Sequence, residues 1–114
     1  MKYVLLIYQP DAFDPKSLPP EEHKAIAEQY QSVTSTSQVT PGLPLGLPQD
    51  AMTVRVKNGE TQVTDGPYVD IAGAVGGYLI FDADTKEEAV ALAARVPAAR
   101  LGGAVEVRPA QAYW

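Results

Sequence analysis

Two stretches of the chain are apolar at nearly every position, which is typical of strands buried on both faces. Residues 3–8 (YVLLIY) form the longer stretch and residues 78–81 (YLIF) the shorter one. A third stretch, residues 104–108 (AVEVR), alternates between apolar and charged side chains, which predicts a strand with one buried face. These three segments are the expected core strands of a sheet.

Two further segments have the apolar spacing of amphipathic helices. The first is expected to begin at Pro20, a residue suited to the first helical turn, and to run towards residue 38. The second follows Asp84 or Thr85, either of which can cap it, and ends at Pro97. Its expected apolar face consists of Ala89, Leu92, Ala93 and Val96.

Residues 52–64 have the pattern of a β-hairpin. Val54 and Val56 alternate with polar residues, and Asn58-Gly59 then supplies the positive φ angles of a type I′ turn. Three segments rich in proline or glycine predict loops: residues 11–18, 40–50 and 65–77.

The predicted order is strand, helix, hairpin, strand, helix, strand, which indicates one α+β domain over residues 1–114. This order of elements is similar to that of a ferredoxin-like sandwich with one extra strand, βαβ(β)βαβ. Because two helices cover only one face of its sheet, the other face would be a large exposed apolar patch on a monomer. A second copy related by a two-fold axis would cover that patch, so we expect a homodimer.

Composition and charge exclude several kinds of catalytic group, cofactor and partner. The 114 residues include no cysteine and one histidine and carry a net charge of −5. A chain without cysteine forms no disulfide and offers no thiolate nucleophile, and the sequence shows no metal-ligand spacing or phosphate loop, so we expect no cofactor or metal. The net negative charge argues against binding to nucleic acid and against binding to an anionic membrane surface. The apolar opening is short for a signal peptide or a membrane span, so a cytoplasmic location is expected.

Several motifs, taken together, resemble one known family. They are DGPY at residues 65–68, GGY at 76–78 and VEVRP at 105–109, together with the opening MKYVLLIY and the proline-glutamate-glutamate start of the first helix. Over essentially its whole length, the chain is similar to the DGPF (DGPFAETKE-type) branch of the YCII-related family. The resemblance implies a ferredoxin-like domain that pairs into a dimeric α/β barrel.

The resemblance also bears on function. Some relatives are encoded beside extracytoplasmic-function sigma factors. Related proteins are suspected enzymes with a histidine–aspartate pair in a cleft, and a few act on small cyclic metabolites. Family members commonly continue the DGPF motif with alanine, glutamate, threonine, lysine and glutamate, where this chain has Val69, Asp70, Ile71, Ala72 and Gly73. Chemistry that needs the lysine of this segment is therefore not expected here.

Two carboxylates are the first candidate catalytic residues. Asp65, at a strand end before a Gly-Pro turn, is either a general base facing a cleft or an acceptor for backbone N–H groups of its own turn. Asp70 either shares a proton with Asp65, if the two side chains meet, or is simply solvated.

Four more residues are candidates. His23 is of the type that changes charge near neutral pH, and lies either at a pocket rim or on an exposed turn. Tyr68 and Tyr78 either line a pocket or pack in the core or the dimer interface. Arg108 either holds an anionic ligand or pairs with Glu106 on the same strand face. The aromatic end, Tyr113-Trp114, either docks on the partner subunit or frays.

Two functions from different classes therefore remain open. The first is a cofactor-independent small-molecule-binding protein or proton-transfer enzyme (isomerase or lyase) acting on a small cyclic metabolite. In the enzyme, Asp65 would be the base, Tyr68 or His23 the acid, and Asp70 would tune Asp65. The second is a non-catalytic interaction or regulatory module, linked for example to an extracytoplasmic-function sigma factor, in which the DGPY turn is structural. The identity of the ligand does not follow from the sequence.

Overall fold

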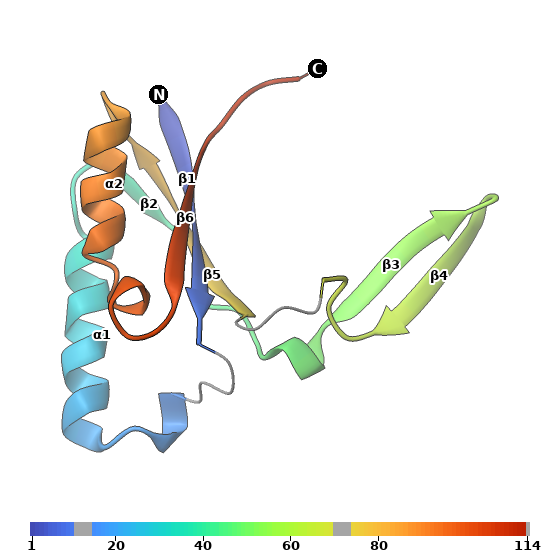
Figure 1. Ribbon diagram of the computed structural model, residues 1–114, viewed down its shortest axis with the longest axis horizontal. Coiled ribbons are helices and arrows are strands. Elements are labelled where there is room, and N and C mark those ends of the chain that lie inside the picture. The colour runs from blue at the N-terminus through green and yellow to red at the C-terminus, as the bar shows by residue number, and fades with distance from the viewer. Residues whose placement is uncertain (11–14, 70–73, 114) are drawn as a thin grey trace.

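A four-stranded antiparallel sheet forms the centre of the molecule (Figure 1). The computed structural model describes residues 1–10, 15–69 and 74–113. The strands stand in the order β2-β5-β1-β6. Their bounds are Lys2–Gln9 for β1, Val39–Pro41 for β2, Ala74–Asp82 for β5 and Ala104–Pro109 for β6.

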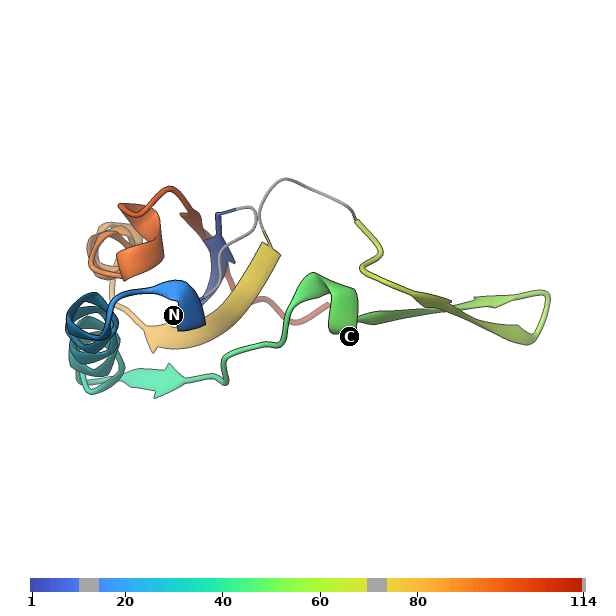
Figure 2. The same ribbon diagram turned by 90° about the horizontal axis from the view of Figure 1, so that it is seen from below.

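Two helices, α1 (Pro20–Thr34) and α2 (Lys86–Ala94), lie on one face of this sheet (Figures 1 and 2). The chain order β1-α1-β2-β5-α2-β6, combined with the strand order, is the ferredoxin-like arrangement, which confirms the α+β prediction. The core lies between the two layers, where Leu5, Val33 and Val96 are at most 1% exposed. We call the main sheet and its two helices the body.

The ends of the helices follow from local side chains. The Thr85 hydroxyl accepts a hydrogen bond from the Glu88 backbone N–H at 3.2 Å, so Thr85 is the cap of α2. The expected apolar face of α2, with Val96 just beyond its end, is fully buried. The first helix ends at Thr34, earlier than the expected residue 38, because the Ser35 and Thr36 hydroxyls donate to carbonyl groups of its last turn. No helix of the described residues is long and apolar enough to span a membrane.

All three predicted loops contain short stretches of regular structure. Strand β2 lies where residues 40–50 were expected to be irregular. It is three residues long and ends in a proline, so it has no alternation of its own and is defined by its pairing with β5. Strand β5 begins at Ala74 rather than at residue 78, within the predicted 65–77 loop. Single 3-10 turns occur at Pro15–Ser17, Pro48–Asp50 and Pro97–Ala99.

The predicted hairpin forms a sheet of its own. Its strands are β3 (Met52–Lys57) and β4 (Glu60–Asp65), and Asn58 and Gly59 between them have φ angles of 52° and 78°, as the type I′ prediction requires. We call this hairpin the arm. It projects from the body on the side away from the helices (Figures 1 and 2). The fourth strand of the main sheet is therefore β2, and the hairpin is an insertion between β2 and β5.

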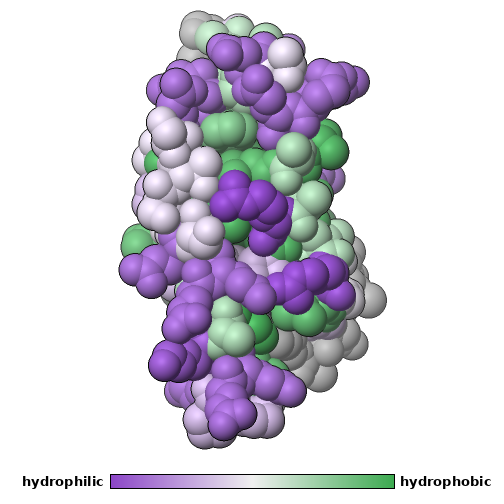
Figure 3. Space-filling view, turned by 90° about the vertical axis from the view of Figure 1, so that its left-hand side faces the viewer, coloured by the Kyte–Doolittle hydropathy of each residue, from purple (hydrophilic) through white to green (hydrophobic). Residues whose placement is uncertain are grey.

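The two sides of the body differ in character. Hydrophilic side chains cover much of the outer surface of the helices, with hydrophobic groups showing between them (Figure 3). On the helix-free face of the sheet, Val4, Leu6 and Tyr8 of β1 lie beside Ile80 and Tyr78 of β5. All of these except Tyr78 are half-buried, and Tyr78 is 38% exposed. The helix-free face is thus apolar at its centre, as expected.

Candidate functional site

A groove of about 1380 Å³ opens at the end of the sheet where β1 finishes and β5 begins. One wall is a face of α1, and another is the segment of residues 42–50 that joins β2 to the arm. Most of its lining side chains are apolar. They include Ile7, Leu18, Ile26, Leu43, Leu45, Leu47 and Val75.

The 42–50 wall is fixed to the sheet by its backbone. The Gly42 N–H donates to the Tyr78 carbonyl at 3.1 Å, and the Leu45 N–H donates to the Gly76 carbonyl at 2.9 Å. Gly42 lies so close to β5 that a Cβ there would be 2.4 Å from the Tyr78 carbonyl oxygen. The sequence of this wall, GLPLGLP, is therefore held in place at one end and presents its leucines over the groove.

Polar side chains are a minority of the described residues that line the groove. Gln9 Nε2 donates to the Tyr30 hydroxyl at 3.2 Å, and this partly buried pair joins the end of β1 to α1. His23 lies two turns before Tyr30 on the same helix face and also lines the groove, as do Asp50 and Tyr78. A mostly apolar cleft with a small number of polar groups is typical of a small-molecule site.

The structure brings two of the predicted site residues to this groove and leaves three elsewhere. His23 and Tyr78 line it, whereas Asp65, Tyr68 and Arg108 are not among the described residues of its walls. The DGPY turn reaches the groove through Pro67, together with the following residue, Val69.

Asp65 is exposed at the end of β4. Its carboxylate accepts no hydrogen bond from the residues that the structure describes, so the turn-acceptor arrangement is not seen among them. The turn is instead tied to β3, since the Gly66 N–H donates to the Ala51 carbonyl and the Thr53 hydroxyl donates to the Gly66 carbonyl, both at 2.7 Å.

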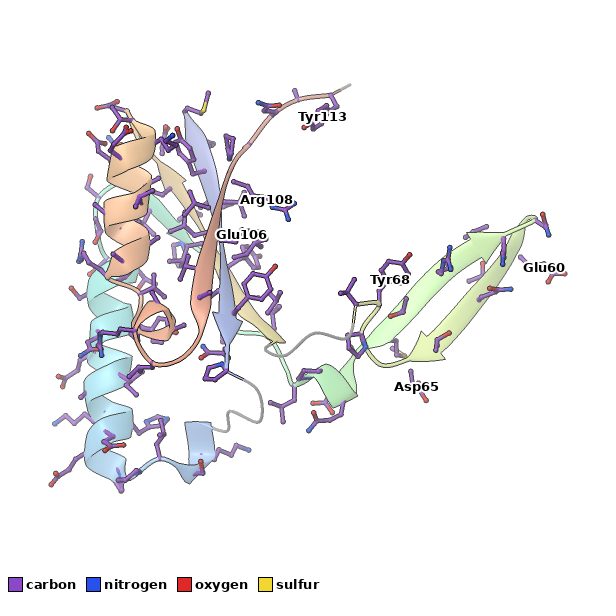
Figure 4. All side chains as sticks on the ribbon, in the orientation of Figure 1. Glu60, Asp65, Tyr68, Glu106, Arg108 and Tyr113 are labelled. Carbon is purple, nitrogen blue, oxygen red and sulfur yellow. The ribbon has the colours of Figure 1, made fainter. Side chains whose placement is uncertain are left out.

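Tyr68 is 71% exposed, and its ring centroid lies 5.6 Å from the Arg55 guanidinium carbon, a cation–π distance. Figure 4 shows Asp65 and Tyr68 on opposite sides of the base of the arm, so these two candidates do not meet. The proposed partner of Asp65, Asp70, lies outside the described residues, as does Trp114. Tyr113 lies on an extended C-terminal tail that leads away from the sheet (Figures 1 and 4).

Arg108 forms an ion pair on β6, as one of its two interpretations predicted. Its Nε donates to Glu106 Oε2 at 2.8 Å, and both side chains project on the helix-free side (Figure 4). The hydrogen bond and the negative charge of Glu106 raise the pKa of the Arg108 guanidinium above its ordinary value. In the described parts of the chain, no three His, Asp or Glu residues are grouped so that they could hold a metal ion.

Some groove residues were not found from the sequence. Gln9 follows a buried strand without any pattern that marks it, and the helical spacing of Tyr30 from Ile26 marks only an apolar helix face. The leucines at positions 43, 45 and 47 did carry a signal, since three large apolar residues are unusual in a loop rich in proline and glycine.

The fold and the groove define a class, a ferredoxin-like α+β domain with a ligand-sized cleft at one end of its sheet. The comparison with family models identifies the family: the chain belongs to the YCII-related domain family, which matches residues 1–111. That match confirms the family resemblance, while membership of the DGPF branch stays a prediction. No curated protein matches the chain significantly.

Proposed function

We propose that this chain is a small-molecule-binding protein whose ligand occupies the groove between α1 and the 42–50 wall. The groove itself carries the proposal. Pockets that enclose a small ligand usually measure about 300–1,000 Å³, so a groove of about 1380 Å³ has room for one. The apolar walls, with polar groups from Gln9, His23 and Tyr30, suit a largely apolar ring with one or two polar substituents.

An enzymatic form of this function is proton transfer on a small cyclic metabolite, of isomerase or lyase type and without a cofactor. His23 lines the groove and is of the residue type suited to acid–base work near neutral pH. The position of His23 supports it as the group that exchanges a proton with the ligand. For Asp65 to act as the general base, its carboxylate would need to reach the ligand from the end of β4.

The functional unit we propose is a homodimer. The chain exposes 8251 Å², whereas a compact monomer of 12.2 kDa exposes about 6,100 Å². Its radius of gyration is 16.0 Å, against about 13 Å for a compact domain of this length. An excess of about 2,000 Å² matches the area that one subunit of an obligate homodimer buries. The apolar helix-free face supports a contact between the two sheets.

The alternative is a non-catalytic interaction or regulatory module. One observation favours it: the region after β4 is exposed, with Tyr68 at 71% and Val69 at 60%. Exposed apolar side chains beside a defined turn are typical of a protein-binding surface. On this alternative, the groove binds no small molecule.

Titration with 8-anilinonaphthalene-1-sulfonate, an apolar fluorescent probe, tests the proposal. Ala25 and Ala27 are both exposed on α1, but only Ala27 lines the groove. We expect saturable binding that Ala27→Trp weakens about tenfold or more, because the indole fills the groove, and that Ala25→Trp leaves within about twofold. Equal affinities for the two variants, or binding that does not saturate, would contradict a ligand site in the groove.

A further inference from the structure

The arm has one apolar face against which no other described residue of the chain packs closely. Its register places Met52, Val54 and Val56 of β3 on the same face as Thr61 and Val63 of β4, with Asp65 opposite Met52 at the end of that face. The four apolar side chains of this set are 60–71% exposed. The opposite face carries Thr53, Arg55, Lys57, Glu60, Gln62 and Thr64.

This pattern is that of a hairpin with one buried face. A two-stranded hairpin that stands alone in water is marginally stable, and it becomes stable when one face packs against another element. The arm stands out from the body, so the body of its own chain does not cover its apolar face (Figures 1 and 2). Since the described residues of the chain supply no cover, a second molecule is needed to bury this face.

The direction and the length of the arm indicate what covers it. The arm projects on the helix-free side of the sheet, where a second copy would pack (Figure 2). Strands of six residues extend about 20 Å, whereas two sheets packed face to face are about 10 Å apart. An arm of this length would therefore reach past the sheet of a second copy and along its body.

We infer that the apolar face of the arm packs against the body of a second copy of this chain, so that each copy holds the other with its arm. This inference rests on the homodimer proposed above. The excess exposed area supports it, because the arm contributes four of the most exposed apolar side chains. Pro67 and Val69, at the base of the arm, line the groove, so the arm and the proposed ligand site are neighbours.

Two neighbouring residues of β4 provide a matched test. Val63 and Thr64 are both β-branched and exposed, but they lie on opposite faces of the arm. In analytical ultracentrifugation of the full chain, we expect Val63→Lys to weaken dimerisation about a hundredfold or more, because the two-fold axis places the change in the interface twice. The dissociation constant of the Thr64→Lys dimer should stay within about threefold of the wild-type value.

The outcomes separate this inference from the dimer proposal. A wild-type dimer that the two variants weaken equally, or not at all, overturns the docking of the arm and leaves the homodimer standing. A wild-type chain that sediments as a folded monomer overturns both. Val56→Lys, on the same face but on β3, should repeat the effect of Val63→Lys, and an unchanged dissociation constant for it would also overturn the inference. Far-UV circular dichroism checks that each variant is folded.

Discussion

Replacing Gly42 with alanine should detach the 42–50 wall from the sheet and open the groove. The added Cβ would lie 2.4 Å from the Tyr78 carbonyl oxygen and 2.7 Å from two atoms of the Tyr78 ring. The ring can turn away, but the carbonyl belongs to the central part of β5 and cannot move without disturbing the ladder with β1. The wall must therefore shift instead.

The shift breaks at least one and at most two backbone hydrogen bonds, from Gly42 to Tyr78 and from Leu45 to Gly76. At about 0.5–1.5 kcal/mol for each bond, the free energy of unfolding should fall by about 0.5–3 kcal/mol. For a domain of this length, such a loss lowers the midpoint of thermal unfolding by about 2–12 °C. Binding of 8-anilinonaphthalene-1-sulfonate should weaken in parallel, because Leu43 and Leu45 leave the groove.

The matched control is in the same wall. A Cβ at Gly46 would meet Asp50 at 3.6 Å, an ordinary contact, and Gly46 has no positive φ angle. Gly46→Ala should therefore leave the melting temperature and the affinity for the probe close to those of the wild type. Thermal unfolding followed by circular dichroism, with the titration beside it, measures both. If Gly42→Ala behaves like Gly46→Ala, the wall is not held against β5 as described.

Three further changes test the body and the arm. Leu5→Ala empties the centre of the core and should cost about 2–5 kcal/mol in urea unfolding; a loss below about 1 kcal/mol would contradict the packing. Thr85→Ala removes the cap of α2 and should cost about 1 kcal/mol in the same assay, while an unchanged midpoint would argue against the cap. Thr53→Val removes the hydrogen bond to the Gly66 carbonyl and should speed limited proteolysis at the base of the arm; an unchanged cleavage rate would show that the bond does not hold the turn.

Elements defined by local chemistry were predictable from the sequence. Asn58-Gly59 set the hairpin, because these residues tolerate the positive φ angles that the turn needs. Thr85 was one of two expected caps, and Pro20 begins α1 where predicted. In each case the determining residues lie within a few positions of the feature that they produce.

Elements defined by distant contacts were not predictable in this way. Strand β5 runs through Gly76, which the pattern placed in a loop. A Cβ at Gly76 would lie 2.6 Å from Gln9 Cγ, so this glycine permits the close approach of two strands. Strand β2 likewise depends on β5 for its hydrogen bonds.

The same distinction applies to the site. His23 and Tyr78 were found because their residue types suggest chemistry, although the groove that contains them forms only when α1 meets the 42–50 wall. Asp65 and Tyr68 belong to one motif, DGPY, and were predicted as base and acid of one site, with His23 as the other candidate acid. A turn between strands can send neighbouring side chains to opposite sides, and this one does (Figure 4).

Nuclear magnetic resonance of the complex with 8-anilinonaphthalene-1-sulfonate can locate the probe in the groove. We expect nuclear Overhauser effects between the aromatic protons of the probe and the methyl groups of Ile26 and Leu45, from the two facing walls. Contacts of the probe with Val54 and Val63 of the arm alone, and none with Ile26 or Leu45, would contradict a ligand site in the groove.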